Sequence, residues 1–162
     1  MSSISYYFAD KSLAKRSTES IQSITKLSST MINDEINNNL LLLEDIIKDE
    51  KIVSNSTNLE EKYKLISNYL NSKEFEYYGI ASRDGSITYN NDKTESLIGK
   101  DFFEDAFSGK IVSNPFSIDG KLFMYYSVPY NDGREEKLLV AVKNAEAISS
   151  VLNNISEFDN SK

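Results

Sequence analysis

Three Asp-Gly pairs divide the second half of the chain into short segments rich in β-favouring residues. The pairs are Asp84-Gly85, Asp119-Gly120 and Asp132-Gly133. Such a pair between two β-type segments is the strongest short-range signal for a β-hairpin, because both residues tolerate the positive φ angles of a tight turn. Consecutive hairpins build an antiparallel sheet. We therefore predict five antiparallel strands, over residues 75–82, 87–90, 110–118, 121–130 and 136–144.

The first part of the chain has a helical pattern instead. Residues 3–49 contain no Gly and no Pro, and their apolar residues recur at helical spacing. Ile21, Ile32 and Leu43 lie 11 residues apart, which keeps an apolar stripe aligned on a straight or slightly right-handed helix. Apolar residues on both sides of this stripe favour two buried faces, one against the sheet and one against a second copy of the chain. A single wide intramolecular face is the alternative.

Shorter helices complete the predicted architecture. Thr57 and Glu60 form a capping-box pattern at the start of a second helix. A short helix with Phe102 and Phe103 lies between the second and third strands, and residues 145–155 form a closing helix. Helices segregated from a hairpin-built sheet indicate an α+β fold. We expect the long N-terminal helix on one face of the five-stranded sheet and the short helix over the other face.

The composition disfavours several classes of function. The chain has 162 residues and a formal net charge of −7, which argues against nucleic acid, because phosphates require a basic surface. It has no His and no Cys, which removes zinc sites of imidazole or thiolate, disulfides and His-based catalytic triads. No segment has the roughly 20 apolar residues of a transmembrane helix. We expect a binding domain with no cofactor and no metal site, rather than an enzyme.

Four stretches follow one another in a characteristic order. They are YYGIASRDGSITYN, IGKDFFEDAFSGKIVSNPF, DGKLFMYYSVPY and KLLVAVKNAEAIS. In order and spacing they resemble the Cache family of PAS-like extracytoplasmic sensor domains, over roughly residues 5 to 155. Members of this family occur in bacterial chemoreceptors, sensor kinases and membrane-bound cyclic-nucleotide signalling enzymes.

The resemblance implies a small-molecule sensor domain of a membrane-anchored bacterial signalling protein, placed outside the cytoplasm. It looks like the membrane-distal module of a two-module receptor. It implies an N-terminal helix and loop over residues 1–56, a PAS-like Cache module over residues 57–144, and a C-terminal helix over residues 145–162 that leads into a following segment. The alternative is a ligand-free module that dimerises within such a receptor.

The resemblance also implies a ligand pocket between the sheet and the short helix. Amino-acid-binding members have an Arg on that helix, and here the matching residue is Lys100, which could bind an anionic group. The two acidic residues that hold the ammonium group of the ligand correspond here to Ile118 and Lys143. The implied ligand is therefore not a typical free amino acid. The expected assembly, from the two apolar faces of the N-terminal helix, is a homodimer through that helix.

The residues of the third and fourth strands favour a site on the same face. A two-residue turn at Asp119-Gly120 would pair Phe116 with Phe123 and Asn114 with Tyr125, which collects aromatic and hydrogen-bonding groups. An ordinary sheet core is the alternative, because aromatic residues are common in strands. The candidate ligand-binding residues are Tyr77, Lys100, Phe102, Asn114, Phe116, Phe123, Tyr125 and Lys143. The register through residues 131–134 is ambiguous by one residue, and a shift would move Lys143 to the other face of the sheet.

The short helix yields one more expectation. Phe103 and Phe107 are four residues apart and share a helix face, so we expect them to anchor the helix to the core. Phe102 then leans toward the pocket. The acidic loops NNDKTE and NDGREE lack the spacing of an EF-hand calcium site and are interpreted as solvated turns.

Overall fold

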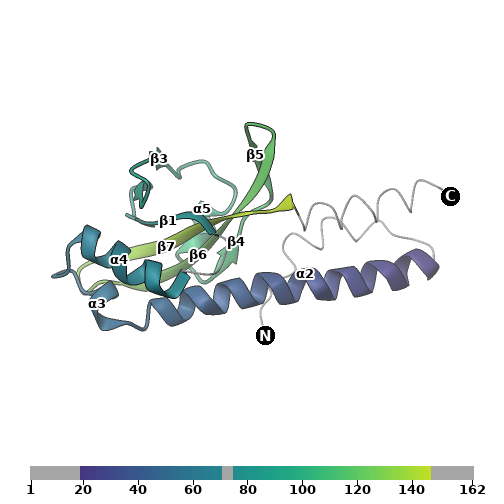
Figure 1. Cartoon of the computed structure of the whole chain (residues 1–162), viewed down its shortest axis with the longest axis horizontal. Coiled ribbons are helices and arrows are strands. Elements are labelled where there is room, and N and C mark those ends of the chain that lie inside the picture. The colour runs from purple at the N-terminus through teal and green to yellow at the C-terminus, as the bar shows by residue number, and fades with distance from the viewer. Residues whose placement is uncertain (1–18, 71–74, 147–162) are drawn as a thin grey trace.

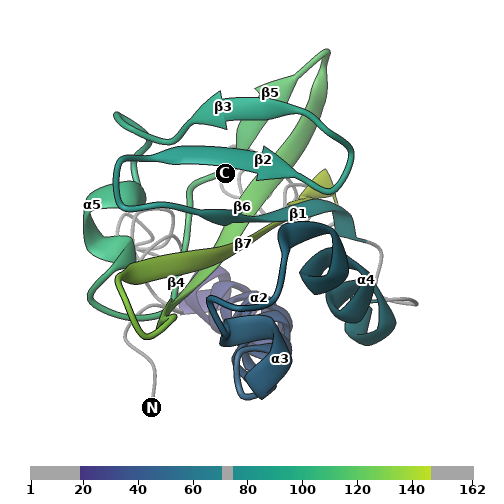
Figure 2. The same cartoon turned by 90° about the vertical axis from the view of Figure 1, so that its left-hand side faces the viewer.

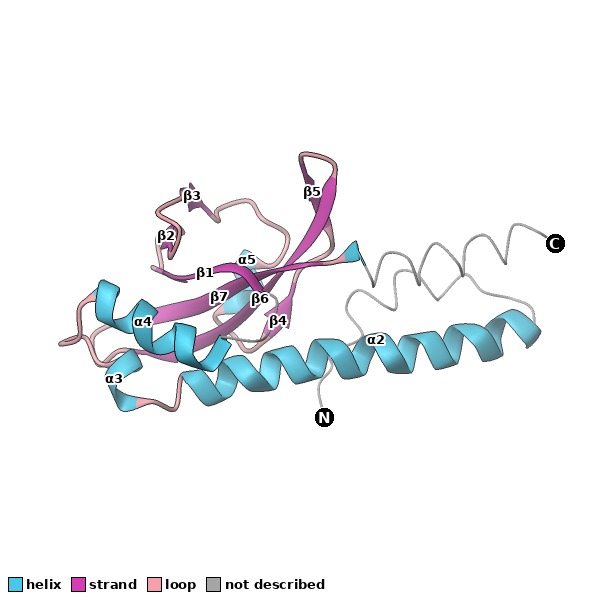
Figure 3. Ribbon diagram, in the orientation of Figure 1, coloured by secondary structure: helices cyan, strands magenta, loops and turns pink. Residues whose placement is uncertain are grey.

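A computed structural model describes residues 19–70 and 75–146, with side chains described from Ile32 onward (Figure 1). Its helices are α2 (Glu19–Ile46), α3 (Glu50–Val53), α4 (Leu59–Leu70) and α5 (Phe103–Ala106). Its strands are β1 (Phe75–Ala81), β2 (Ser86–Tyr89), β3 (Thr94–Ser96), β4 (Ile111–Val112), β5 (Phe116–Ile118), β6 (Lys121–Asn131) and β7 (Glu136–Asn144). The predicted α+β class is confirmed, and Figure 3 shows helices and strands segregated in this way.

The strands form one antiparallel sheet in the order β3-β2-β1-β7-β6-β4, with β5 also paired to β6. Two differences from the predicted five strands stand out. The prediction missed β3, and the predicted strand 110–118 is split into β4 and β5. The split follows from a change of register, since Val112 pairs with Tyr126 but Phe116 pairs with Phe123. Pro115, which has no N–H to donate, lies at this irregularity.

The three Asp-Gly pairs lie in the three predicted hairpin turns. Asp119 and Gly120 have φ angles of 52° and 80°, as a two-residue turn between β5 and β6 requires. Gly85 and Gly133 also have positive φ, in the β1–β2 and β6–β7 turns. These local signals located the turns correctly.

Helix α2 covers one face of the sheet, as predicted. Its buried side chains include Ile32, Ile36, Leu40 and Leu43, and they share a core with Tyr126 and other sheet residues. The N-terminal half of α2 extends beyond the end of the sheet (Figure 1).

Several predictions about the terminal helices are untested. Residues 3–18 of the predicted helix 3–49 lie outside the described residues, as does most of the predicted helix 145–155. The predicted homodimer through the N-terminal helix and the division at residues 56 and 144 stay predictions. Among the described residues, no helix is both long and apolar enough to cross a membrane.

Helix α4 packs beside α2 on the same face of the sheet. Asn58 caps it, since its Oδ1 accepts a 2.8 Å hydrogen bond from the Glu61 amide, so the predicted capping box at Thr57 was wrong by one residue. Tyr63 ties α4 to the sheet. Its hydroxyl accepts a hydrogen bond from the Ile80 amide at 2.9 Å and donates one to the Thr88 carbonyl at 2.5 Å.

The opposite face of the sheet carries a second core under α5 (Figure 2). Phe102 and Ala106 are fully buried there, against strand residues that include Tyr125, Val140 and Val142. The expected arrangement of one helix layer on each face is confirmed. The α5 face is therefore where the predicted pocket has to be sought.

Candidate functional site

A stack of three aromatic rings occupies the α5 face. The Tyr125 ring of β6 lies between Phe102, at a centroid distance of 4.9 Å, and Phe116 of β5, at 4.5 Å. Both contacts are close to parallel, with interplanar angles of 26° and 15°. Phe123 adjoins Phe116 at 6.1 Å. The stack joins α5 to the sheet and forms one wall of the site.

Two further tyrosines form the facing wall. Tyr77 of β1 and Tyr89 of β2 meet edge to face, with ring centroids 4.6 Å apart. The ammonium group of Lys93 lies 5.7 Å from the Tyr77 centroid, within the range of a cation–π contact. The site thus contains ring faces from four strands.

A single carboxylate connects the two aromatic walls. Glu95 of β3 accepts hydrogen bonds from the hydroxyl of Tyr89 and from the hydroxyl of Tyr125, the latter at 3.0 and 3.2 Å to its two oxygens. The Lys100 ammonium lies 3.7 Å from the same carboxylate. The Glu95 side chain is 27% exposed, so this carboxylate is held by protein groups but still reaches the surface.

The two tyrosine hydroxyls remain protonated donors. Burial raises the pKa of Tyr89, and the hydrogen bond to Glu95 and the negative charge of Glu95 raise it further. Burial also raises the pKa of Tyr125, again with a contribution from Glu95. A carboxylate fixed by two phenols and flanked by ring faces is suited to an ammonium group, since both the negative charge and the ring quadrupoles attract a cation.

Seven of the eight predicted site residues lie on or beside this face of the sheet. They are Tyr77, Lys100, Phe102, Asn114, Phe116, Phe123 and Tyr125. Whether they contact a ligand stays a prediction. Sequence reasoning missed Glu95, because it interpreted NNDKTE as a solvated turn. The alternation of Thr94, Glu95 and Ser96 after a turn was the available indication of a short strand.

Lys143 is the eighth predicted residue, and it lies on the opposite face. Its ammonium group contacts Glu35 Oε2 of α2 at 3.1 Å and Asn39 Oδ1 at 3.2 Å, and it lies 5.2 Å from the Phe75 ring centroid. The reason is register. Lys143 pairs with Met124, whose side chain belongs to the α2 core, and a shift of one residue reverses the face of every side chain in a strand.

The predicted pairing of Asn114 with Tyr125 is also wrong by one residue. Ser113 takes that place, since its amide donates to the Tyr125 carbonyl at 2.9 Å and its Oγ accepts from the Tyr125 amide at 2.9 Å. The predicted pairing of Phe116 with Phe123 is confirmed. Asn114 lies in the irregularity between β4 and β5, with its amide donating to Asp101 Oδ2 at 3.0 Å.

The roles predicted for the two adjacent phenylalanines are exchanged in the structure. Phe102 is fully buried, whereas Phe103 and Phe107 are only partly buried and pack edge to face on one another at 5.4 Å. The guanidinium of Arg83 covers the Phe107 ring at 4.4 Å. Because Phe102 precedes the single turn of α5, its side chain enters the core at the start of the helix rather than along its face.

Comparison by sequence gives no relative. No protein-family model matches the chain, and no curated protein matches it.

Comparison by structure gives sensory domains of bacterial chemoreceptors. The sensory domain of Campylobacter jejuni Tlp3 with isoleucine bound has a TM-score of 0.63 at 13% identity, covering 90% of this chain and 66% of that one. The ligand-binding domain of Pseudomonas aeruginosa PctB with L-Gln has a TM-score of 0.64 at 12% identity, covering 84% and 59%. That of the amino acid chemoreceptor PctC with GABA has a TM-score of 0.62 at 15% identity, covering 80% and 65%. At these identities the fold is what is shared, and this chain spans less than two thirds of each of these domains.

These neighbours overturn the prediction that the ligand is not a typical free amino acid. Tlp3 binds isoleucine and L-valine, and PctB binds L-Gln. The prediction relied on the missing acidic residues at Ile118 and Lys143. The structure supplies a carboxylate from a different strand, at Glu95, so those two positions do not decide the class of ligand.

Proposed function

We propose that this chain is an extracytoplasmic sensor domain of a bacterial transmembrane signalling protein, with no catalytic activity of its own. The fold shared with chemoreceptor sensory domains supports this proposal. Its sensing unit is the module of residues 57–144, with the α5 face as the ligand site. The ligand is a small molecule with an ammonium group, and free amino acids are included.

The observation that carries the proposal is the position of Glu95. Its carboxylate lies between two tyrosine hydroxyls and is balanced by a single cation, Lys100, at 3.7 Å. That distance is near the limit of an ion pair, and exposed pairs of this kind contribute only about 0–1 kcal/mol. The ammonium group of a ligand can therefore replace Lys100 on Glu95 at little cost. The released Lys100 is then free to bind the carboxylate of an amino acid.

A second candidate function has an observation in its favour. Phe102, Tyr125 and Phe116 already stack on one another, so their rings fill much of the space beneath α5. A domain filled in this way could serve as a ligand-free structural module within a receptor.

Thermal denaturation with a panel of free amino acids and simple amines separates the two candidates. A ligand present at one hundred times its dissociation constant adds about 2.7 kcal/mol to the free energy of unfolding. We expect Glu95→Gln to weaken binding at least about tenfold, because a charged hydrogen bond contributes about 1.5–3 kcal/mol. Glu104→Gln, an exposed acidic residue on α5, is the matched control and should leave binding unchanged. A panel without any stabilising compound favours the structural module.

A further inference from the structure

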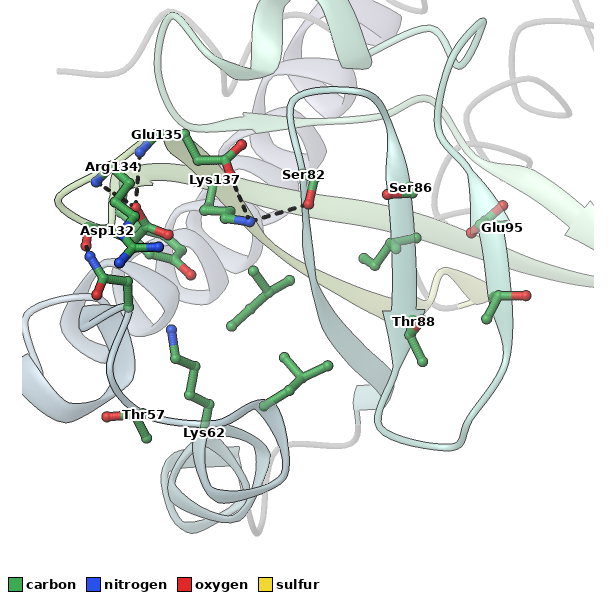
Figure 4. A pocket seen from close by; sticks show the side chains of 16 residues that line it. Thr57, Lys62, Ser82, Ser86, Thr88, Glu95, Asp132, Arg134, Glu135 and Lys137 are labelled. Carbon is green, nitrogen blue, oxygen red and sulfur yellow. Dashed lines mark hydrogen bonds and ion pairs between the residues drawn. The ribbon is translucent and has the colours of Figure 1, made fainter.

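A separate cavity of about 590 Å³ lies on the other face of the sheet, between α4, the β1–β2 hairpin and the β6–β7 turn (Figure 4). Lys62 of α4 points into it, as do Lys137 of β7 and Ser82 at the end of β1. The side chain of Asn55 donates a 2.9 Å hydrogen bond to the Asp132 carbonyl and closes one end. Glu95 of β3 also lines this cavity, so the cavity and the Glu95 site share that residue.

Lys62 is an unmatched cation in this cavity. Only 7% of the residue is exposed, and its ammonium group makes no hydrogen bond or ion pair with any residue that the structure describes. Burial lowers the pKa of Lys62, with Lys137 adding to the effect and Asp132 opposing it. An ammonium group that is partly desolvated and has no direct partner, with only the more distant charge of Asp132 to balance it, favours an anion beside it.

Tyr130 of β6 supplies a second unmatched group. Its hydroxyl is buried, lines the same cavity and has no hydrogen-bond partner within residues 19–70 and 75–146. Burial raises the pKa of Tyr130, and the charge of Asp132 raises it further, so the hydroxyl remains a donor. Buried hydroxyls in folded proteins are nearly always hydrogen-bonded. Two donors without a direct partner therefore lie at this cavity, the ammonium group of Lys62 and the buried hydroxyl of Tyr130.

The other charged groups around the cavity already have partners or face solvent. Lys137 is shared between Glu135 at 3.5 Å and Ser82 Oγ at 3.2 Å. Asp132 Oδ1 accepts hydrogen bonds from the amides of Arg134 and Glu135, and these hold its pKa low against the effect of burial. The carboxylates of Asp132 and Glu135 lie at the β6–β7 turn, and their negative charges oppose a doubly charged anion more strongly than a singly charged one.

We propose that this cavity binds a small monocarboxylate, with its oxygens on Lys62 Nζ and the Tyr130 hydroxyl. A carboxylate has two oxygens for the two donors, and Lys62 supplies a largely buried positive charge to meet it. Leu59 and Ile80 provide an apolar lining for a short aliphatic tail. The proposal rests on Lys62 and Tyr130 and does not invoke the Glu95 carboxylate, although Glu95 also lines the cavity.

Amide NMR titrations with acetate, propionate and butyrate, at constant sodium concentration, test this proposal. We expect saturable shifts at residues 62, 130 and 137, with dissociation constants on the order of 1 mM for so few ligand atoms. Lys62→Met keeps the length of the side chain and removes the charge, so it should weaken binding about tenfold or more. Tyr130→Phe should also weaken it. Lys64→Met, an exposed lysine on the same helix, is the matched control and should have no effect.

Three results would overturn the proposal. The first is the same affinity in Lys62→Met as in the unaltered chain. The second is the lack of any saturable shift at residues 62, 130 and 137. The third is tighter binding of inorganic phosphate than of acetate, which would assign the cavity to a different class of anion.

Discussion

The hydroxyl of Tyr125 donates to both carboxylate oxygens of Glu95, 30 residues earlier in the chain, at 3.0 and 3.2 Å. This contact joins β6, in the interior of the sheet, to β3 at its edge. A ligand that binds Glu95 therefore acts on both strands and, through the stacking of Tyr125 on Phe102, on α5. The predictions below test this site and its surroundings.

Lys100→Met should separate amino acids from simple amines. In the proposed mode Lys100 binds the carboxylate of the ligand while Glu95 binds its ammonium group. The substitution should weaken amino-acid binding about tenfold, by the loss of one charged hydrogen bond, and should leave or strengthen the binding of amines without a carboxylate. Isothermal titration calorimetry of both classes measures the difference. Equal losses for both classes would contradict this assignment of Lys100.

Phe102→Ala should destabilise the domain far more than Phe103→Ala. Truncation of a fully buried Phe costs about 3–5 kcal/mol, and Phe102 has no exposed surface and loses its stacking on Tyr125. Phe103 is only partly buried at the edge of this core, where it packs on Phe107, so its loss should cost less. Urea unfolding of both variants gives the two free energies. A larger loss for Phe103→Ala would show that the packing of α5 differs from that described.

Lys143→Met should change acid stability without changing ligand binding, because Lys143 lies on the α2 face. Burial tends to raise the pKa of Glu35, but the hydrogen bond and charge of Lys143 outweigh it and hold that pKa below its usual value. A lowered carboxyl pKa in the folded state contributes stability that is present above the unfolded-state pKa and is lost as the pH falls. The substitution should remove this contribution, about 1 kcal/mol or less for such a pair.

Unfolding of the unaltered chain and of Lys143→Met as a function of pH measures that contribution. The two curves should converge in acid, where Glu35 is protonated in both. A loss of affinity at the Glu95 site in this variant would mean that the two faces of the sheet are coupled.

Tyr63→Phe should weaken the attachment of α4 to the sheet. The change leaves the Ile80 amide and the Thr88 carbonyl without their bridging hydroxyl, at a cost of about 1–3 kcal/mol. Tyr69→Phe, on the exposed side of the same helix, removes only a solvent-exposed hydrogen bond to Asp49 Oδ2 at 3.1 Å, so as the comparison variant it should cost less. Urea unfolding at neutral pH compares the two variants.

Alkaline pH should destabilise the domain through ionisation of the Tyr63 hydroxyl. Burial raises the pKa of Tyr63 to about 12 in the folded state, while an unfolded tyrosine titrates near pH 10. Between about pH 10 and pH 12 the unfolded chain therefore binds fewer protons, so the free energy of unfolding falls as the pH rises, and below pH 10 the contribution is complete. The fall should be shallower in Tyr63→Phe. An unchanged slope would show that Tyr63 does not titrate in this range.

Local signals in the sequence located most of the elements. Asp119 and Gly120 both adopt positive φ angles, which few other residue pairs accept. The turn could therefore be identified from these two residues alone. Ile32 and Leu43 recur on the buried stripe of α2 because helical spacing alone sets which face a residue shares. Such features depend on neighbours in the chain and need no knowledge of the rest of the fold.

The composition of the α5 face followed from the same kind of reasoning. Alternation along β6 places Phe123 and Tyr125 together, and the tight turn places Phe116 opposite Phe123. The sequence by itself thus determined that Phe116, Phe123 and Tyr125 share the face of the antiparallel sheet opposite the long helix.

Only the tertiary structure decided on which face of the sheet the charged side chains lie and which groups they contact. A one-residue irregularity at Ser113 and the pairing of Lys143 with Met124 are set by contacts between distant strands. Each shift of one residue exchanges the two faces, so Lys143 joins Glu35 on the α2 side. Glu95 accepts a hydrogen bond from Tyr125 because β3 pairs antiparallel with β2, which brings its carboxylate to the Tyr125 hydroxyl. No local pattern encodes that contact, since its two partners meet only when the sheet is complete.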